Sequence, residues 1–280
     1  MRIDLHSHST ASDGTEPPAE VVRRAAEAGL DVLALTDHDT TAGLEEAAAS
    51  LPPGLTLVPG IEISCAYEGI SLHLLAYLAD GRDAALAGAL ERLRADRLRR
   101  GEAMVERCVA LGAPLSWERV RALAGDGAVG RPHVARALAE AGVVASTADA
   151  FTPDWIGDGG RAYVPKEALD TEEAIGLVRE AGGVSVFAHP LAESRGPVVD
   201  DTAIRTFAAV GLLGLEVDHP DHTAAHRAHL RRLADELGLL VTGSSDDHGS
   251  MTGHRLGTET TSPESYARIL AAATGTPLAR

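Results

Sequence analysis

The stretch Arg2-Ile3-Asp4-Leu5-His6-Ser7-His8 opens the chain with a short run typical of a strand and two histidines. Residues 17–28 have the pattern of a helix, with a proline near its start and Gly29 after its end. A second apolar run over 31–36 predicts the next strand. A strand, a helix and a further strand in this order are typical of α/β folds.

The same alternation continues in both halves of the sequence. After the second strand we expect a short helix over 41–49, a strand over 55–58 and an apolar run over 70–78. A parallel sheet or barrel explains this alternation most economically. Later strands are predicted over 184–188, 212–217 and 239–242, with helices near 204–210 and 224–237.

The stretch 83–151 has a different character, because Ala, Leu, Arg and Glu recur at helical spacing and no strand-like run is present. A long helix is predicted over 82–111, and Ser116 is placed to cap the start of another. We therefore predict that residues 83–151 form a helical insertion, and that residues 1–82 and 152–280 form one barrel domain.

Composition narrows the class of protein. The chain has 280 residues, 45% of them hydrophobic, and a formal net charge of -16. This negative charge argues against coating long nucleic acid, which requires a field of basic residues. No run approaches the roughly 20 apolar residues of a membrane span, and the first residues lack the order of a signal peptide, so we expect a cytoplasmic protein without a membrane partner. Cys65 and Cys108 are too few and too far apart to indicate disulfides or a thiolate metal site.

Histidines and carboxylates recur where predicted strands meet their loops, the usual place for chemistry in parallel α/β folds. His6 and His8 are two residues apart, so a strand presents both on one face and one metal can bind both. Asp13 lies in a Ser-Asp-Gly turn, where an ordinary turn aspartate is the alternative, and His73 lies in an apolar run, where a core histidine is the alternative. Independent chance would scatter histidines over helices and loops as well. The remaining candidates follow strands: His38, Glu62, His189, Asp246 and His248.

Together these residues resemble the motifs of the PHP (polymerase and histidinol phosphatase) superfamily. The resemblance extends over nearly the whole chain and implies an α/β fold, a distorted (β/α)7 barrel that holds three divalent metal ions. One departure is Asp247, where relatives often carry an aromatic residue between two ligands. The motifs that carry the resemblance are His6-x-His8, Asp13, Thr36-Asp37-His38, Gly60-Ile61-Glu62, His73, Ala188-His189-Pro190 and Asp246-x-His248.

The resemblance also implies how the ligands are divided, with Glu62 as a bridge. Nitrogen and oxygen ligands without a thiolate suit manganese, which we expect, or iron or zinc. Two cations that share a carboxylate, about 3.5 to 4 Å apart, suit phosphoryl transfer. The implied sets are His6, His8, Glu62 and Asp246 for the first metal, Glu62, His73 and His189 for the second, and Asp13, His38 and His248 for the third.

Four further residues are predicted to hold the substrate, and the resemblance suggests that all four contact its phosphate groups. Arg131 and His133 begin a helix whose N-terminus favours an anion, although a capping arrangement is the alternative. Lys166 is the single lysine of the chain. Arg195 follows the loop of His189, where a solvated loop cation is the alternative.

These features predict a metal-dependent phosphoesterase with a small phosphorylated substrate and the insertion as a lid. The favoured substrate is a 3′,5′-nucleotide bisphosphate that loses its 3′-phosphate, and trimming of short RNA 5′ ends belongs to the same group of relatives. His219 and His222 follow one strand, and we favour His222 as the donor of a proton to the leaving oxygen. A phosphatase of another ester, such as histidinol phosphate, an amidohydrolase and a non-catalytic metal-binding module are the alternatives.

Overall fold

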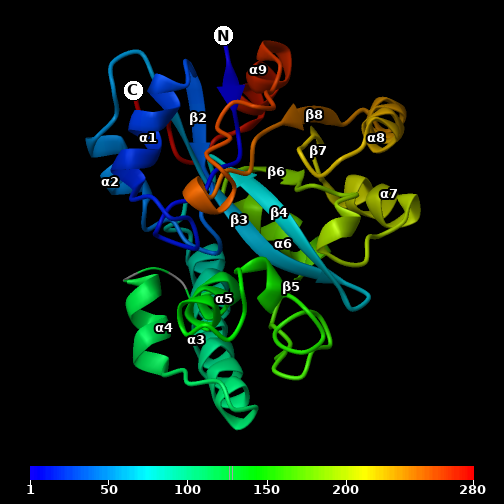
Figure 1. The fold of residues 1–280 in the computed structure, drawn as a ribbon. Coiled ribbons are helices and arrows are strands. Elements are labelled where there is room, and N and C mark those ends of the chain that lie inside the picture. Colours follow the sequence, from blue (N-terminus) through cyan, green and yellow to red (C-terminus); the bar gives the residue numbers. More distant parts are fainter. Residues whose placement is uncertain (126, 128) are drawn as a thin grey trace. The chain divides into compact units, whose positions relative to one another are not determined.

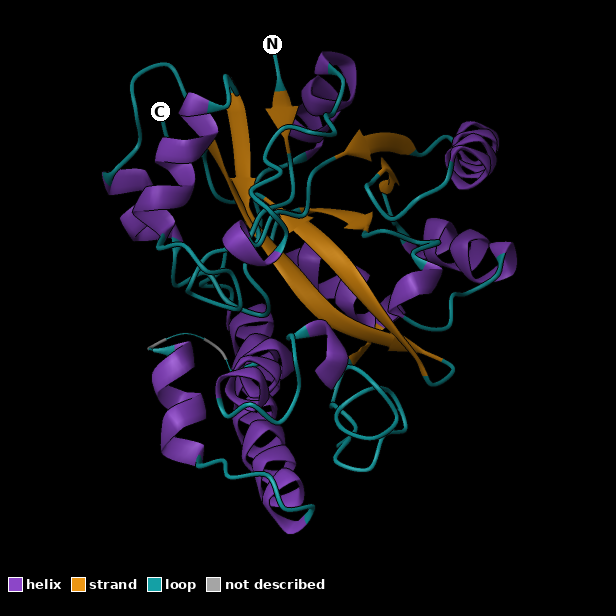
Figure 2. Ribbon diagram, in the orientation of Figure 1, coloured by secondary structure: helices purple, strands orange, loops and turns teal. Residues whose placement is uncertain are grey.

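The structure is a computed structural model that describes residues 1–125, 127 and 129–280. It divides into two compact units, Met1–Leu90 with Ala168–Arg280 and Glu91–Glu167. The first unit contains the sheet, and the second consists of helices and loops (Figures 1 and 2). The role of the insertion as a lid stays a prediction.

The first unit is organised around one nearly closed, barrel-shaped sheet, which confirms the α/β barrel expected from the sequence (Figure 2). Neighbouring strands follow the order β1-β2-β3-β4-β6-β7-β8, and β5 pairs with β3 off this path. The strands are β1 (Ile3–Asp4), β2 (Val32–Leu35), β3 (Thr56–Tyr67), β4 (Ile70–Tyr77), β5 (Leu169–Asp170), β6 (Val184–Phe187), β7 (Gly214–Asp218) and β8 (Leu240–Gly243).

Strand β4 departs from the predicted parallel arrangement, because it runs antiparallel to both β3 and β6. A two-residue turn joins it to β3, and both turn residues, Glu68 and Gly69, have positive φ angles of 48° and 81° that suit a tight hairpin. Strand β3 is therefore 12 residues long, and the expectation that it ends at residue 58 is wrong. Glu62 consequently lies inside β3 instead of following it.

The two ends of the sheet meet beside the buried Asp4. Its carboxylate accepts hydrogen bonds from the backbone amides of Ser245 (3.0 Å) and Gly257 (2.8 Å). Burial raises the pKa of Asp4 to about 6. A parallel bridge between Ser7 and Asp247 lies just beyond it in the sequence. Contacts from loop segments thus bring the first and the last strand together.

Helices of the first unit pack against neighbouring strands (Figure 1). Several begin at a polar cap; Asp200, for example, accepts a hydrogen bond from the amide of Ala203 (3.0 Å) at the start of α7. One apolar core joins side chains of the strands to helix α9, and in it the Tyr77 hydroxyl donates to the Leu5 carbonyl (2.9 Å). The helices of this unit are α1 (Pro18–Glu27), α2 (Leu44–Ala49), α6 (Thr171–Glu180), α7 (Asp201–Val210), α8 (Ala224–Leu237) and α9 (Pro263–Ala272), with short 3₁₀ turns η2 (Glu193–Arg195) and η3 (Gly249–Met251).

The second unit has its own apolar core, against which Trp117 and Trp155 pack. The Ser116 side chain accepts a hydrogen bond from the amide of Arg119 (3.2 Å), as its predicted capping role requires. Arg100 is buried and donates to the Val164 carbonyl (2.6 Å). The helices are α3 (Ala84–Ala110), whose first residues belong to the first unit, α4 (Trp117–Ala124), α5 (Arg131–Glu140) and the 3₁₀ turn η1 (Ala148–Ala150).

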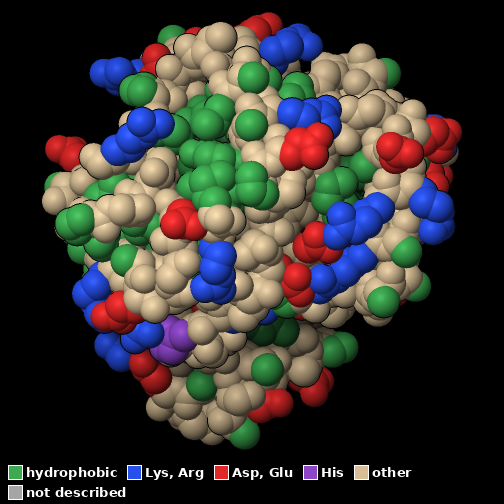
Figure 3. Space-filling model, turned by 90° about the horizontal axis from the view of Figure 1, so that it is seen from above, with side chains coloured by type: hydrophobic (Ala, Val, Ile, Leu, Met, Phe, Trp, Pro, Cys, Tyr) green, Lys and Arg blue, Asp and Glu red, His purple; other side chains and the backbone are tan. Residues whose placement is uncertain are grey.

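Acidic and basic side chains are interspersed on the face drawn in Figure 3, with hydrophobic side chains gathered between them. On this face there is no continuous basic field of the kind that binds long nucleic acid. Among the described residues, no helix combines the length and the hydrophobicity that a membrane span requires.

Candidate metal centre

The candidate site gathers side chains from segments that are far apart in the sequence. Strands β1, β2, β6 and β8 run in one direction, so residues that follow them come together at one end of the barrel. The hairpin β3–β4 supplies two more residues from within its strands. In chain order, β1 is followed by His6 and His8, β2 by His38, β6 by His189 and β8 by Asp246 and His248, while Glu62 lies in β3 and His73 in β4.

Glu62 lies at the centre of this group, and its side chain is only 1% exposed. Each oxygen of its carboxylate lies between 2.9 and 3.2 Å from imidazole nitrogens. These nitrogens come from different strands and loops, which is the arrangement expected of a bridging carboxylate. Oε2 faces His6, His8 and His38, and Oε1 faces His73 and His189.

Asp246 has two oxygens with different surroundings. Oδ2 accepts a hydrogen bond from Arg195 Nη2 (2.6 Å) and faces His219 Nε2 at 3.4 Å. Oδ1 is buried and accepts no hydrogen bond from the residues that the structure describes. Three imidazole nitrogens lie 3.2 to 3.5 Å from Oδ1, so this oxygen is placed to face a cation. They belong to His6, His8 and His248.

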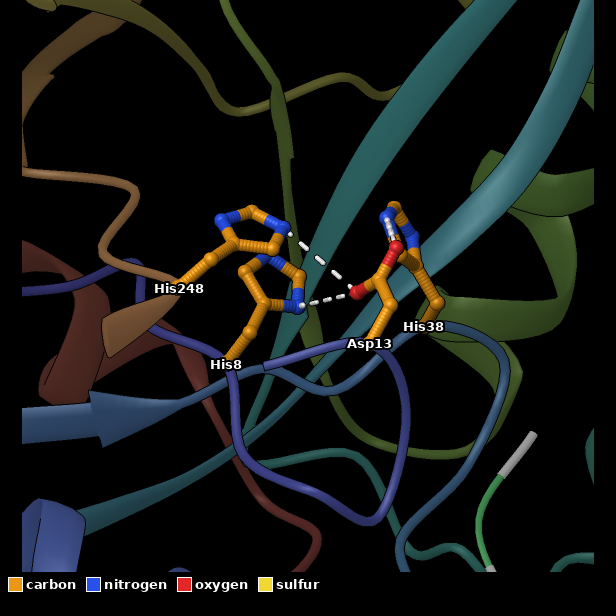
Figure 4. Close-up of side chains that lie close together, drawn as sticks. All are labelled: His8, Asp13, His38 and His248. Atoms are coloured by element: carbon orange, nitrogen blue, oxygen red, sulfur yellow. Dashed lines mark ion pairs between the residues drawn. The ribbon is translucent and has the colours of Figure 1, made fainter. Parts of the chain in front are cut away.

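Asp13 forms a second centre of the same kind, and its carboxylate points between three imidazoles (Figure 4). Its oxygens lie 3.4 Å from His248 Nε2, 3.7 Å from His38 Nε2 and 3.9 Å from His8 Nδ1. The rings of His8 and His248 stack with centroids 4.1 Å apart. The two centres adjoin because His8 also contacts Glu62.

Burial and ion pairing act against each other at this site. Burial would raise the pKa of Glu62, but the surrounding imidazoles, His38 foremost, hold that pKa well below its usual range. The pKa of Asp246 is lowered against the same effect of burial, with His6 the strongest neighbour. Conversely, burial disfavours a charged His8, but Asp246 and Glu62 raise its pKa to about 10. The carboxylates are therefore ionised and require positive charge.

The donor set fits a cluster of divalent cations. Nitrogen and oxygen ligands without sulfur suit manganese, iron or zinc, and cations would supply the positive charge that neutral imidazole ligands lack. Three groups have ligand atoms that all lie within 4.8 Å of one another: His6, His8, Glu62 and Asp246; His8, Asp13, His38 and His248; and His38, Glu62 and His73. Of the predicted second set, Glu62 and His73 form such a group with His38, while His189 lies 3.1 Å from Glu62 Oε1.

Two buried aspartates beside His38 form hydrogen bonds that join the loop after β2 to the loop after β1 and to strand β3. Asp37 accepts from the amide of Ser9 (2.8 Å), from its hydroxyl (2.7 Å) and from the hydroxyl of Ser12 (2.6 Å). Asp39, at a φ of 56°, accepts from the amide (2.7 Å) and hydroxyl (3.0 Å) of Ser64. The sequence places both aspartates beside His38 but does not show that their partners are amide and hydroxyl groups.

Asp247 folds the loop that carries His248. Its carboxylate accepts hydrogen bonds from the amides of Arg255 (2.7 Å) and Gly249 (2.9 Å) and from the hydroxyl of Thr252 (3.0 Å). This position, where the resemblance leads one to expect an aromatic residue, therefore has a structural role in this chain.

Glu216 is a residue of the site that sequence reasoning missed. It is fully buried within β7, where its carboxylate accepts from His6 Nδ1 (2.9 Å), the His189 amide (2.8 Å) and the Ser244 hydroxyl. Burial would raise the pKa of Glu216, but the neighbouring imidazoles, His6 foremost, have the opposite effect and together hold the pKa of this carboxyl below its usual range. The available signal was a charged residue between Leu215 and Val217 in an otherwise apolar strand.

Arg195, one of the predicted substrate residues, lies beside the candidate metal ligands. Besides Asp246, its guanidinium contacts Asp221 Oδ2 (2.7 Å). Arg255, which the sequence did not single out, donates from Nη2 to the Asp246 carbonyl (2.8 Å) and lies 3.8 Å from Asp246 Oδ2. Two guanidinium groups therefore meet at one carboxylate.

The two candidate proton donors have different hydrogen bonds. His222 Nδ1 donates to the Val217 carbonyl (2.9 Å), and its Nε2 accepts from the amide of Leu191 (3.1 Å), so backbone groups engage both ring nitrogens. Burial lowers the pKa of His222. In His219, Nδ1 accepts from the Asp221 amide (3.1 Å), which leaves the proton on Nε2, the atom that faces Asp246.

Arg131, His133 and Lys166 belong to the second unit. Arg131 pairs with Asp158 (2.6 Å), and its guanidinium lies 5.8 Å from the ring centre of Tyr163. His133 is buried and its Nδ1 accepts from the Gly130 amide (3.0 Å), which is a capping contact. Lys166 is partly buried and follows Tyr163 by three residues.

Comparisons with known proteins found relatives that align with most of this chain. Residues 4–92 match the family model described as the PHP domain. A 5′-3′ exoribonuclease of Haemophilus influenzae is 37% identical and aligns over 88% of this chain and 90% of its own length. A 3′,5′-nucleoside bisphosphate phosphatase of Chromobacterium violaceum is 34% identical over 90% of this chain and 89% of its own. A solved structure from Bifidobacterium adolescentis, described as a metal-dependent phosphoesterase, is 37% identical, covers 97% of this chain and 96% of its own, and has a TM-score of 0.91.

Proposed function

The chain belongs to the PHP family of metal-dependent phosphoesterases, and from this premise we propose that it hydrolyses the 3′-phosphate of 3′,5′-nucleoside bisphosphates. The products are a nucleoside 5′-monophosphate and inorganic phosphate. The relative with this substrate in its name supports the proposal, since the alignment with it spans 90% of the chain.

The observation that carries the proposal is the environment of Glu62, whose two oxygens face separate sets of imidazoles. We assign to it the role of a bridge between two of three divalent cations, with manganese favoured and iron or zinc as alternatives. Such cations activate water for attack and offset the charge of phosphate oxygens. The ligands proposed are His6, His8, Asp13, His38, Glu62, His73, His189, Asp246 and His248.

Hydrolysis of the ester breaks the bond between phosphorus and the 3′ oxygen, so a proton must reach that oxygen as it leaves. The hydrogen bonds of the two candidates support His219 more than His222 for this task, because Nε2 of His219 carries a proton and points toward Asp246. Arg195 lies at the same carboxylate and is proposed to contact phosphate. Arg131, His133 and Lys166, which belong to the second unit, are proposed to hold the second phosphate.

Removal of nucleotides from the 5′ end of short RNA is a second candidate activity. It is favoured by the exoribonuclease relative, whose 37% identity is similar to that of the phosphatase relative. Both reactions transfer a phosphoryl group to water and need the same metal ligands. Substrate preference, not site chemistry, distinguishes them.

The test is steady-state kinetics of manganese-loaded protein on a nucleoside 3′,5′-bisphosphate, the matching 3′-monophosphate and a short 5′-phosphorylated RNA. We expect kcat/KM for the bisphosphate to exceed that for the monophosphate at least ~10-fold, since a second phosphate adds charge-assisted contacts that the monophosphate lacks. Equal kcat/KM values for the two nucleotides would indicate a generic phosphatase. Preferred release of mononucleotides from the RNA would indicate an exoribonuclease. Glu62→Gln protein, which should be inactive, controls for contaminating phosphatases.

A further inference from the structure

We propose that Glu216 is a positioning residue that selects the ring nitrogen with which His6 faces the metal ions and holds the turn of His189. The inference rests on the metal-binding roles proposed for these two histidines. Glu216 is outside the groups of possible ligand atoms, and hydrogen bonds within the protein use both of its oxygens. Its part is therefore to orient ligands.

The first step concerns the His6 ring. Glu216 Oε1 lies 2.9 Å from His6 Nδ1, and an ionised carboxylate can only accept, so this nitrogen carries a proton. The lone pair of a neutral His6 ring is then on Nε2. That atom faces the candidate ligands Glu62 (3.2 Å) and Asp246 (3.3 Å).

The second step concerns the backbone of His189, which donates from its amide to Glu216 Oε2 (2.8 Å). His189 has a φ of 33°, a conformation that residues other than glycine rarely adopt. A buried acceptor at its amide stabilises this turn. With the turn held, His189 Nε2 lies 3.1 Å from Glu62 Oε1.

One carboxylate thus connects two candidate ligands from separate parts of the barrel. His6 follows β1 and His189 follows β6, whereas Glu216 lies in β7. Carboxylates that accept from a metal-binding imidazole typically change metal affinity or activity about 10- to 100-fold when they are replaced. We expect the same range for Glu216.

Glu216→Gln is the direct test, because glutamine keeps the shape but has one accepting oxygen and cannot accept from both His6 and His189. We expect about 10- to 100-fold weaker binding of manganese and zinc in competition with a chelator. In zinc-loaded protein, the NMR signal of the His6 Nδ1 proton should shift or disappear. Ser244→Ala is the matched control, since it removes a different donor to Glu216, and its metal affinity should stay within about 3-fold of the wild type.

Wild-type affinity together with an unchanged His6 signal in Glu216→Gln would overturn the proposal. If circular dichroism shows that this variant does not fold, Glu216→Asp provides the second test. Aspartate keeps the charge but is one methylene shorter and cannot reach both partners, so about 10-fold weaker metal binding is expected, and wild-type affinity refutes the proposal. Neither measurement uses a substrate, so failure of the bisphosphate proposal is a separate result.

Discussion

His219 Nε2 lies 3.4 Å from Asp246 Oδ2, whereas the neighbouring His222 directs both ring nitrogens to backbone groups. The first is placed to move a proton at the site, and the second joins the strand end at Val217 to the loop at Leu191. The two imidazoles should therefore respond differently to replacement.

His219→Ala should lower kcat about 100-fold or more with little change in KM, because general acid catalysis contributes on this scale. His222→Ala should leave kcat within about 10-fold but lower the free energy of unfolding by about 1 to 3 kcal/mol, since it leaves buried backbone groups without their partners. Steady-state kinetics and urea unfolding of both variants measure these effects. A larger loss of kcat in His222→Ala would restore the assignment made from sequence.

Elemental analysis of gently purified protein should approach three equivalents of transition metal per chain. Glu62→Ala should lose at least two of them, because its carboxylate faces two sets of imidazoles. Glu236→Gln, which alters only an exposed ion pair with Arg205, should retain all three. Loss of a single equivalent in Glu62→Ala would contradict the bridging role.

Asp37→Ala should loosen the loop that carries Asp13 without removing any proposed ligand. Three hydrogen bonds from Ser9 and Ser12 are lost. We expect the free energy of unfolding to fall by about 1 to 3 kcal/mol and one metal equivalent to be lost. Urea unfolding and elemental analysis check this, with the exposed Asp31→Asn as the control. Unchanged metal content would show that Asp13 does not need this support.

Arg131→Ala should raise KM for a bisphosphate about 10-fold and change kcat little, because a second phosphate is contacted in both the ground state and the transition state. Lys166→Ala should behave in the same way. Kinetics on the bisphosphate and the 3′-monophosphate measure both effects. If Lys166→Ala changes KM for neither substrate, the inference from Lys166 being the single lysine is wrong.

Cys108 should react slowly with iodoacetamide in the folded protein. Burial raises the pKa of its thiol from 9.0 to about 11, so near pH 8 the reactive thiolate is about 100-fold scarcer than for an ordinary thiol. The unfolded thiol loses its proton at lower pH than the folded one. The contribution of Cys108 to the free energy of unfolding therefore falls as pH rises from 9.0 to about 11. Mass spectrometry measures the labelling of Cys108 with and without urea. Equal labelling rates in the folded and the unfolded protein would contradict the prediction.

The regular part of the fold could be predicted because local patterns determine it. The strand 184–188 and the helix 224–237 correspond to β6 and α8 within a residue, since apolar periodicity and caps mark them. The hairpin β3–β4 was missed because its turn, Glu68-Gly69, lacks the asparagine or aspartate that usually signals such a turn. The antiparallel direction of β4 depends on pairing with β6, a contact distant in sequence.

The candidate ligands could be named from their motifs, but the residues that orient them could not. The partners of Glu216 and Arg255 are seen only when β7 and the loop after β8 are placed beside His6 and Asp246. The grouping of His38 with Glu62 likewise depends on an isolated bridge between the loop after β2 and strand β3. Such relations depend on tertiary distances that no local pattern contains.

The seam between β1 and the loop after β8 has a consequence for biosynthesis. The ribosome makes His6 and His8 well before Asp246 and His248, and contacts such as the bridge between Ser7 and Asp247 join the two segments in the folded chain. A nascent chain therefore presents isolated imidazoles, which bind metal weakly, until translation has passed residue 248. The proposed centre thus cannot be completed before residue 248 has been made, and a premature stop just before residue 246 leaves a chain without two of its ligands.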